Sequence, residues 1–238
     1  MAKRPIFIID EQQSSFFKEK NIEFEWFAGM AVSQKQKSVR SLHNAGELEG
    51  ISNILEVSTK SEEVLGNQLS AFNLSIMGNN GKGLPLEIAF QGSKVFKNGG
   101  PYHDLYNKDV LAVKRDERIS KKFVITGFNF QGEVWDSEPK TAFYDWLYIN
   151  ALNQKISEDK DFLYKNILNY SAFTDIEFNP KKSLNCQARS CAVFVSLFKK
   201  NLLQAALESR EAFLDILSED PFYTVEKEQN LEQAEFDF

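Results

Sequence analysis

The chain has 238 residues, of which 42% are hydrophobic and 13% aromatic, and this is enough apolar material for one large domain or two small ones. It has two cysteines, Cys186 and Cys191, and two histidines, His43 and His103, which argues against a zinc site or a Cys/His nucleophile pair. It has no apolar run of about 18 residues and no signal-like start, so we expect a cytoplasmic protein without a membrane segment. We expect both thiols in the core and His43 on a helix surface.

The formal net charge of −6 is unevenly distributed along the chain. Residues 205–238 contain ten acids and two bases, a local net charge of −8, which leaves +2 for residues 1–204. Positive side chains gather in three clusters: Lys35, Lys37 and Arg40; Lys114, Arg115, Arg118, Lys121 and Lys122; and Lys181, Lys182 and Arg189. Such clusters can bind phosphates or can be ordinary solvated faces, and the sequence leaves both interpretations open.

The first part of the chain predicts short strands and one helix. Apolar and β-branched runs predict strands at 5–9, 22–32, 51–58 and 69–76, and three- and four-residue spacing predicts a helix over 34–48. The stretch "MGNNGKGLP" at 77–85 predicts a turn or loop because glycine tolerates positive φ. It resembles a phosphate-binding loop only superficially, because its spacing is not G-x-x-x-x-G-K-[ST].

The segment "LPLEIAFQGSKVFKN" at 84–98 predicts an amphipathic helix, with Pro85 in its first turn and the glycines that follow at its end. Glu87, Gln91 and Lys94 are spaced i, i+4 and i+7, so they share one face of that helix. A solvated ion-pair face would explain them. An acid, an amide and an amine directed into a partly dry cleft could also protonate a leaving group, orient a substrate and supply a nucleophile.

The second half of the chain predicts mostly helices. A charged helix is expected near 107–120 and a strand pair over 121–135, and helical spacing then recurs at 141–154, 160–170, 187–207 and 210–219. The predicted fold is therefore a helix-rich α+β domain with a small mixed sheet, over residues 1–218. We expect residues 219–238 to form an acidic, flexible tail.

The segment "LPLEIAFQGSKVF" resembles the signature E-x-x-[FY]-Q-x-x-K-F of the NADAR superfamily, proteins related to NAD and ADP-ribose metabolism. The pattern falls on Glu87, Phe90, Gln91 and Lys94, with its last Phe displaced by one residue to Phe96. The upstream "LSAFNL" is similar to the "LSNF" strand of that superfamily, although Ala71 shifts its register.

Four longer segments extend the resemblance over most of residues 3–215. They are "AVSQKQKSVRSLH" at 31–43, "AFQGSKVFKNGGPYHDLY" at 89–106, "EPKTAFYDWLYINAL" at 138–152 and "FTDIEFNPKKSLNCQARS" at 173–190. They are similar to the NADAR antitoxin branch that accompanies DarT-type DNA ADP-ribosylating toxins.

This resemblance implies an N-glycosidase, an ADP-ribosyl glycohydrolase that removes ADP-ribose from guanine bases in single-stranded DNA and so reverses the toxin's modification. It implies that Lys94 engages the anomeric carbon of the ribose through a Schiff-base-type intermediate. Glu87 would be the general acid toward the departing guanine and then the base toward water. No cofactor and no metal are expected, because an acid and a lysine suffice for this chemistry.

The resemblance also suggests binding residues. The candidates to stack on a base are Phe72, Phe90, Tyr102 and Trp135, and those to approach the diphosphate are Gly99 and Gly100. Ribose hydroxyls would be bound by Asn73, Gln91 and Asn150, and the pocket would be closed by Asp175, Asn185 and Arg189. The DNA backbone would be contacted by Lys35, Lys37, Arg40, Lys181 and Lys182. Core packing for the aromatics, a helix cap for the glycines and a salt-bridged core for Asp175 and Arg189 are the alternatives.

Two other functions remain open at this point. The chain could be an N-glycosidase of a small nucleotide-like metabolite, which would show little salt-dependent binding to DNA. It could also be a non-catalytic antitoxin that neutralises its toxin by binding it, for example through the acidic tail.

Overall fold

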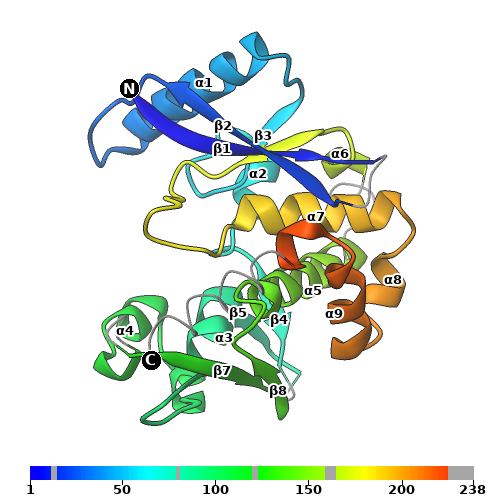
Figure 1. Cartoon of the computed structure of the whole chain (residues 1–238). Coiled ribbons are helices and arrows are strands. Elements are labelled where there is room, and N and C mark those ends of the chain that lie inside the picture. The colour runs from blue at the N-terminus through cyan, green and yellow to red at the C-terminus, as the bar shows by residue number, and fades with distance from the viewer. Residues whose placement is uncertain (12–14, 79–80, 120–122, 159–164, 225–238) are drawn as a thin grey trace, which may run out of the picture.

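The computed structural model of the chain describes residues 1–11, 15–78, 81–119, 123–158 and 165–224 (Figure 1). Its elements in chain order are β1 (Ala2–Ile9), β2 (Phe17–Phe24), α1 (Val32–Leu48), β3 (Ile54–Glu56), α2 (Val64–Gln68), β4 (Ser75–Met77), β5 (Gly83–Pro85), α3 (Leu86–Gly92), β6 (Lys94–Phe96), η1 (His103–Asn107), α4 (Val110–Lys114), η2 (Glu117–Ile119), β7 (Ile125–Phe130), β8 (Glu133–Asp136), α5 (Ala142–Glu158), α6 (Lys165–Ile167), β9 (Ala172–Thr174), α7 (Gln187–Lys199), α8 (Leu203–Ala206) and α9 (Arg210–Ser218). The helix-rich α+β class expected from the sequence is confirmed.

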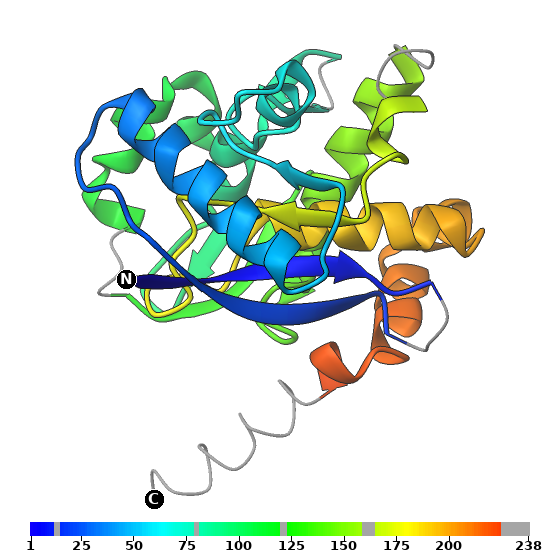
Figure 2. The ribbon, with the colours of Figure 1, turned by 90° about the horizontal axis from the view of Figure 1, so that it is seen from above.

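A four-stranded sheet with the order β2-β1-β9-β3 forms the first layer. β1 pairs antiparallel with β2 and β9, and β9 pairs parallel with β3. Consecutive residues of β1 face opposite sides, so Ile6 packs with Val39 and Leu42 of α1 while Phe7 belongs to the larger core beside α7. One face of the sheet is thus covered by α1 and the other by α7 (Figures 1 and 2).

The two long helices α5 and α7 pack against one another and separate this sheet from the second layer (Figure 1). α7 is buried from Gln187 to Leu197, which suits a helix that is apolar on most sides. The second layer contains the antiparallel sheet β6-β7-β8, the β4-β5 hairpin and α3. Phe90 of α3, Phe128 of β7 and Phe143 of α5 pack ring against ring, with centroids 4.5–6.2 Å apart, and this contact fixes α3 between α5 and β7.

The helix expected over 84–98 is shorter than predicted. α3 ends at Gly92, and Lys94 begins β6, where it lies opposite Phe128 of β7. The side chain of Tyr106 occupies the space beside Gly92, since a Cβ there would lie 2.4 Å from the Tyr106 Cε1. The pairing of β6 with β7, a contact between segments distant in sequence, therefore overrides the local helical pattern.

Four other predicted elements differ from the structure. The second strand is β2 at Phe17–Phe24 rather than 22–32. In place of the start of the strand expected over 69–76, residues 70–73 form a turn before β4, in which the Asn73 N–H donates to the Ser70 carbonyl at 2.8 Å. The helix expected at 107–120 is broken into η1, α4 and η2, with Asp109 capping α4 through the Ala112 N–H. Residues 160–164 of the predicted helix 160–170 lie outside the described residues, and within 165–170 the structure shows the short helix α6.

The cysteine prediction is confirmed, because Cys186 and Cys191 are free thiols buried in the core. His43 is not a surface residue of α1 as expected. It is partly buried beside the sheet, and its Nε2 lies 2.8 Å from the Thr174 Oγ1. Thr174 in turn donates to Glu56 at 2.7 Å, so these three residues form a continuous polar chain under α1.

The part of the chain after α9 begins with buried side chains. The Phe16 N–H donates to Asp220, and the Tyr223 hydroxyl donates to Asp145 at 3.0 Å. Residues 219–224 thus pack onto the domain, whereas 225–238 lie outside the described residues. Within the described ranges, no helix has both the length and the apolar character needed to cross a membrane.

Candidate active-site cleft

A cleft of about 950 Å³ opens between α3, β6, β7 and the segment that precedes α7, and we call it the α3 cleft. This volume lies within the range of small-molecule binding sites. The residues that line it are Glu87, Phe90, Gln91, Lys94, Phe96, Ile119, Phe123, Val124, Ile125, Phe128, Ser137, Glu138, Lys140, Tyr144, Pro180, Lys181, Lys182, Ser183, Leu184 and Asn185. The cleft thus gathers four segments that are far apart in sequence.

One side of the α3 cleft carries a hydrogen-bonded chain of three side chains. The Lys94 ammonium donates to the Gln91 Oε1 at 2.7 Å, and the Gln91 Nε2 donates to the Glu87 Oε1 at 3.0 Å. Glu87 and Gln91 are one turn apart on α3, and Lys94 reaches them from the first residue of β6. The predicted grouping of acid, amide and amine is therefore present, although two elements supply it.

The aromatic wall beside this chain holds the lysine in place. The Lys94 Nζ lies 4.7 Å from the centre of the Phe90 ring, a cation–π distance. The ring of Tyr144 packs edge-on against Phe90, with centroids 5.2 Å apart. Burial raises the pKa of Tyr144, and the charges of Glu87 and Asp175 raise it further. The phenol therefore keeps its proton and is a hydrogen-bond donor in the cleft.

The α3 cleft is also lined by three further lysines from other segments of the chain. Lys140, Lys181 and Lys182 line it, and the last two are exposed to solvent. The Asn185 Oδ1 is buried and accepts no hydrogen bond from the described residues. A buried amide oxygen without a donor costs stability, so this atom is suited to a ligand that donates to it.

Five of the residues predicted to catalyse or to bind ADP-ribose line the α3 cleft: Glu87, Phe90, Gln91, Lys94 and Asn185. Two of the predicted DNA contacts, Lys181 and Lys182, line it as well. The remaining predicted residues lie elsewhere, for separate physical reasons.

Trp135 and Arg189 belong to the core. Trp135 is 2% exposed and packs against Phe143, which corrects its prediction as a base-stacking residue. Arg189 forms an ion pair with Asp145 at 3.3 Å, with side chains only 4% and 0% exposed. The salt-bridged core alternative holds for Arg189, because a buried guanidinium needs a carboxylate partner.

Phe72 and Asn73, in the 70–73 turn, face solvent, whereas Ser70 and Ala71 are buried. The ring of Phe72 is 47% exposed, and the Lys114 Nζ lies 4.3 Å from its centre. The Asn73 amide donates to the side chain and carbonyl of Asn67, at 2.9 Å each. Neither residue is among the described residues that line the cleft, because this segment is a turn and not the expected strand.

Four other predicted residues contact their own neighbours. Gly99 and Gly100 have positive φ in the turn after β6, and Gly100 packs against the Lys94 carbonyl, so glycine is required there by the backbone. Tyr102 lies under the Arg118 guanidinium, 4.6 Å from it. The Asn150 amide donates to the Trp146 carbonyl within α5.

Asp175 is buried one step behind the cleft. Its carboxylate accepts the N–H groups of Glu177 and Phe178. Burial raises its pKa to about 7. Its charge contributes to the raised pKa of Tyr144, which lines the cleft.

The first basic cluster lies on α1, away from the α3 cleft. Lys35 pairs with Glu177 at 3.2 Å, and Arg40 pairs with Glu62. Lys37 is exposed on the same helix. In the second cluster Arg118 is held by Asp104 and Asp116, and Lys121 and Lys122 lie outside the described residues.

Sequence reasoning missed Tyr144, Lys140 and Glu138 as cleft residues. Tyr144 stands in the apolar pattern of a helix, where an aromatic residue indicates core packing. Only the position of α5 beside α3 shows that Tyr144 lines the cleft. Among the residues described, no group of three His, Cys, Asp or Glu side chains could hold a metal ion.

The fold and the cleft define a helix-rich α+β protein with a candidate site that contains an acid–amide–amine chain. The family model described as the DarT1-associated NADAR antitoxin matches residues 2–227. The chain therefore belongs to this antitoxin family. A comparison with curated proteins found no match.

Proposed function

We propose that the protein is an ADP-ribosyl glycohydrolase that removes ADP-ribose from guanine bases in DNA, and that it acts in the cytoplasm. The observation that carries the proposal is the chain Glu87–Gln91–Lys94, which places a carboxylate and an amine on the same side of one cleft. Membership in a DarT1-associated antitoxin family supports it, because an antitoxin can act by reversing the modification that a toxin makes.

The reaction needs a nucleophile and a proton donor at the bond between the ribose anomeric carbon and the guanine nitrogen. In the proposed step, the Lys94 ammonium first gives a proton to the Glu87 carboxylate. The resulting amine forms a bond to the anomeric carbon while the bond to guanine breaks, and Glu87 gives that proton to the departing nitrogen. The ribose ring opens to an iminium on Lys94. Glu87 then takes a proton from water, water adds to the carbon, and the amine leaves with ADP-ribose as product.

The remaining cleft residues fit an ADP-ribose ligand. The unpartnered Asn185 Oδ1 is suited to accept a ribose hydroxyl, and the Tyr144 phenol is a donor. Lys140, Lys181 and Lys182 provide positive charge for a diphosphate and for the DNA backbone. Because a base stacked inside a duplex cannot enter such a cleft, we infer that the modified base enters it from single-stranded or flipped-out DNA.

The test follows the release of free ADP-ribose by mass spectrometry from a single-stranded oligonucleotide that carries the guanine adduct. The wild type should release it, and Lys94→Ala should be slower by about a thousandfold or more, because nucleophile and acid act as a unit. Lys97→Ala is the matched control, since Lys97 is an exposed lysine nearby that does not line the cleft. Full turnover by Lys94→Ala would rule out the assigned nucleophile.

Two other outcomes would redirect the proposal. Release from a small nucleotide adduct but not from DNA would favour a metabolite N-glycosidase. A Lys94→Ala variant that still protects cells, with protection lost on removal of residues 225–238, would favour an antitoxin that works by binding its DarT1 toxin.

A further inference from the structure

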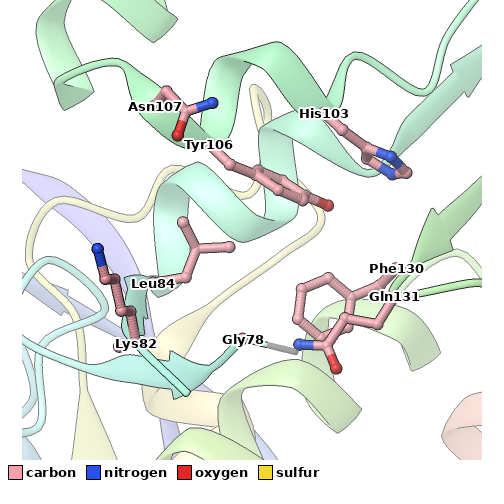
Figure 3. A pocket seen from close by; sticks show the side chains of 9 residues that line it. Gly78, Lys82, Leu84, His103, Tyr106, Asn107, Phe130 and Gln131 are labelled. Carbon is pink, nitrogen blue, oxygen red and sulfur yellow. The ribbon is translucent and has the colours of Figure 1, made fainter. Parts of the chain in front are cut away.

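A second cavity of about 420 Å³ shares no lining residue with the α3 cleft, and we call it the His103 cavity. Its lining residues are Gly78, Lys82, Gly83, Leu84, His103, Tyr106, Asn107, Phe130 and Gln131. Figure 3 shows its two walls. One wall is the η1 turn with His103, Tyr106 and Asn107, and the other joins the β4-β5 hairpin to the turn after β7.

The upper wall of the His103 cavity is aromatic and fixed in place. The His103 and Tyr106 rings stack with centroids 5.1 Å apart and planes 28° apart. The His103 Nε2 donates to the Asn129 carbonyl at 3.1 Å, and the Tyr106 hydroxyl lies 2.9 Å from the Ser93 Oγ. Phe130 meets Tyr106 edge-on, with centroids 6.4 Å apart, and adds a third ring to the cavity. Such preordered rings bind a planar heteroaromatic ligand at low entropic cost.

The polar groups of the cavity sit around these rings. The Gln131 amide donates to the Met77 carbonyl at 2.8 Å, which orients its oxygen, and Asn107 presents a second amide from the η1 turn. Lys82 extends from the β4-β5 hairpin at the opposite end (Figure 3). Aromatic rings, two amides and one ammonium match the three parts of a nucleotide: a base face, a hydrogen-bonding base edge and a phosphate.

The two cavities lie along one strand. Phe128 lines the α3 cleft and Phe130 lines the His103 cavity, and residues two apart on β7 have Cα atoms about 7 Å apart. The Tyr106–Ser93 contact joins the aromatic wall directly to the residue before Lys94. The two cavities are therefore near neighbours that share strand β7.

We propose that the His103 cavity binds a nucleotide, supplied by the strand whose modified guanine occupies the α3 cleft. The base stacks beside His103 and Tyr106, the amides of Asn107 and Gln131 contact its edge, and Lys82 contacts a phosphate. This assignment rests on the proposed function for its DNA substrate, and it adds a second contact point on the same strand.

The first test measures binding of a fluorescent, unmodified single-stranded decanucleotide by anisotropy, so it does not depend on turnover. His103→Ala and Lys82→Ala should each weaken binding about fivefold to tenfold, because each removes one base or phosphate contact. Both side chains are exposed, so the variants should fold, which circular dichroism verifies. Lys3→Ala, an exposed lysine of β1 in the first layer, is the charge-matched control and should bind like the wild type.

A second measurement titrates free deoxyadenosine monophosphate by calorimetry and separates the two sources of a nucleotide. Weak binding of the monophosphate that is lost in His103→Ala, together with weaker decanucleotide binding, supports the assignment. Monophosphate binding with no change for the decanucleotide would overturn the strand as the source. Wild-type affinity of both variants for both probes would overturn the site altogether.

A third measurement keeps this inference apart from the proposed function. On the guanine-adduct oligonucleotide, His103→Ala and Lys82→Ala should raise KM with kcat unchanged, whereas a failure of the glycohydrolase proposal removes turnover from the wild type itself. An equal kcat/KM for wild type and variants would contradict the second contact point.

Discussion

Two clusters of charged and polar side chains in this protein differ in their access to solvent: one lines the α3 cleft and the other is buried in the core. In the α3 cleft, Glu87, Gln91 and Lys94 lie in a chain that faces a cavity of about 950 Å³. In the core, Asp145 accepts from Arg189, Ser190 and Tyr223 and is fully enclosed. Access to solvent accounts for the difference in role. A fully buried ion pair can only hold elements together, whereas the side chains of the cleft can exchange their hydrogen-bond partners for a ligand.

The core group is a junction of the fold. Arg189 and Ser190 come from α7, Asp145 from α5, and Tyr223 from the last described turn. The Arg189 guanidinium also donates to the Leu184 carbonyl at 2.8 Å, one residue before Asn185 of the cleft. The structural pair thus positions one edge of the site without lining it.

The largest expected effect is on the cleft side of this comparison. Glu87→Gln should lower turnover of the guanine adduct about 10²- to 10⁴-fold with little change in unfolding temperature, because it removes a proton donor from a partly exposed position. A substrate whose leaving group needs no protonation should restore most of the rate. Steady-state kinetics on both substrates tests this, and an equal loss on both would assign Glu87 to binding.

On the core side, Arg189→Met should destabilise the protein by about 3–5 kcal/mol, because it leaves Asp145 buried without its cation. Urea unfolding followed by circular dichroism measures the loss. The double variant Asp145→Asn/Arg189→Met should recover part of it, since it removes the uncompensated charge. If the double variant is no more stable than Arg189→Met, the ion pair is not the source of the effect.

The buried acid Glu56 makes the stability of the core dependent on pH, and this can be measured separately from activity in the cleft. Burial raises the pKa of Glu56 to about 8, and the charge of Asp175 adds to the effect. The folded state therefore holds the proton more tightly than the unfolded state, whose pKa is about 4.5. The stability that this group contributes is complete below that value and is lost as pH rises through about 8.

We therefore expect the wild type to unfold at a lower temperature at pH 9 than at pH 6. The free energy of unfolding should be lower at pH 9 by on the order of a few kcal/mol. Glu56→Gln should flatten this dependence, because its amide carries no charge. Thermal unfolding of both proteins at the two pH values provides the measurement. An equally steep loss in the variant would assign the pH dependence to other groups.

The smallest expected effect concerns the contact between Gly92 of α3 and the ring of Tyr106. Alanine is normally the better helix residue by about 0.5–1 kcal/mol. Gly92→Ala should nevertheless destabilise by about 1–3 kcal/mol, because its Cβ would lie 2.4 Å from the Tyr106 ring. Gly78→Ala, at a glycine of the β4-β5 turn, is the variant whose free energy of unfolding is compared with that of Gly92→Ala. Unfolding free energies that are equal for wild type and Gly92→Ala would mean that the ring can move aside.

Much of the architecture could be predicted from local sequence. The helical spacing of α1, α5 and α7 and the alternation of β1 and β7 follow from apolar periodicity. The short signature around Glu87 and Lys94 predicted four residues that line the cleft, because residues close in sequence must lie close in space. Elements shorter than about five residues were poorly predicted, since tertiary pairing decides them.

What the sequence alone determined is therefore the class of fold and the acid, amide and amine of the candidate site. What only the tertiary structure decided is which distant residues join them. Trp135 and Arg189 carry plausible side chains for a ligand site, yet Trp135 is buried against α5 and α9 and Arg189 of α7 is buried against α5. Tyr144, also on α5, lines the cleft instead. The physical reason is that burial depends on long-range packing, which a local pattern does not contain.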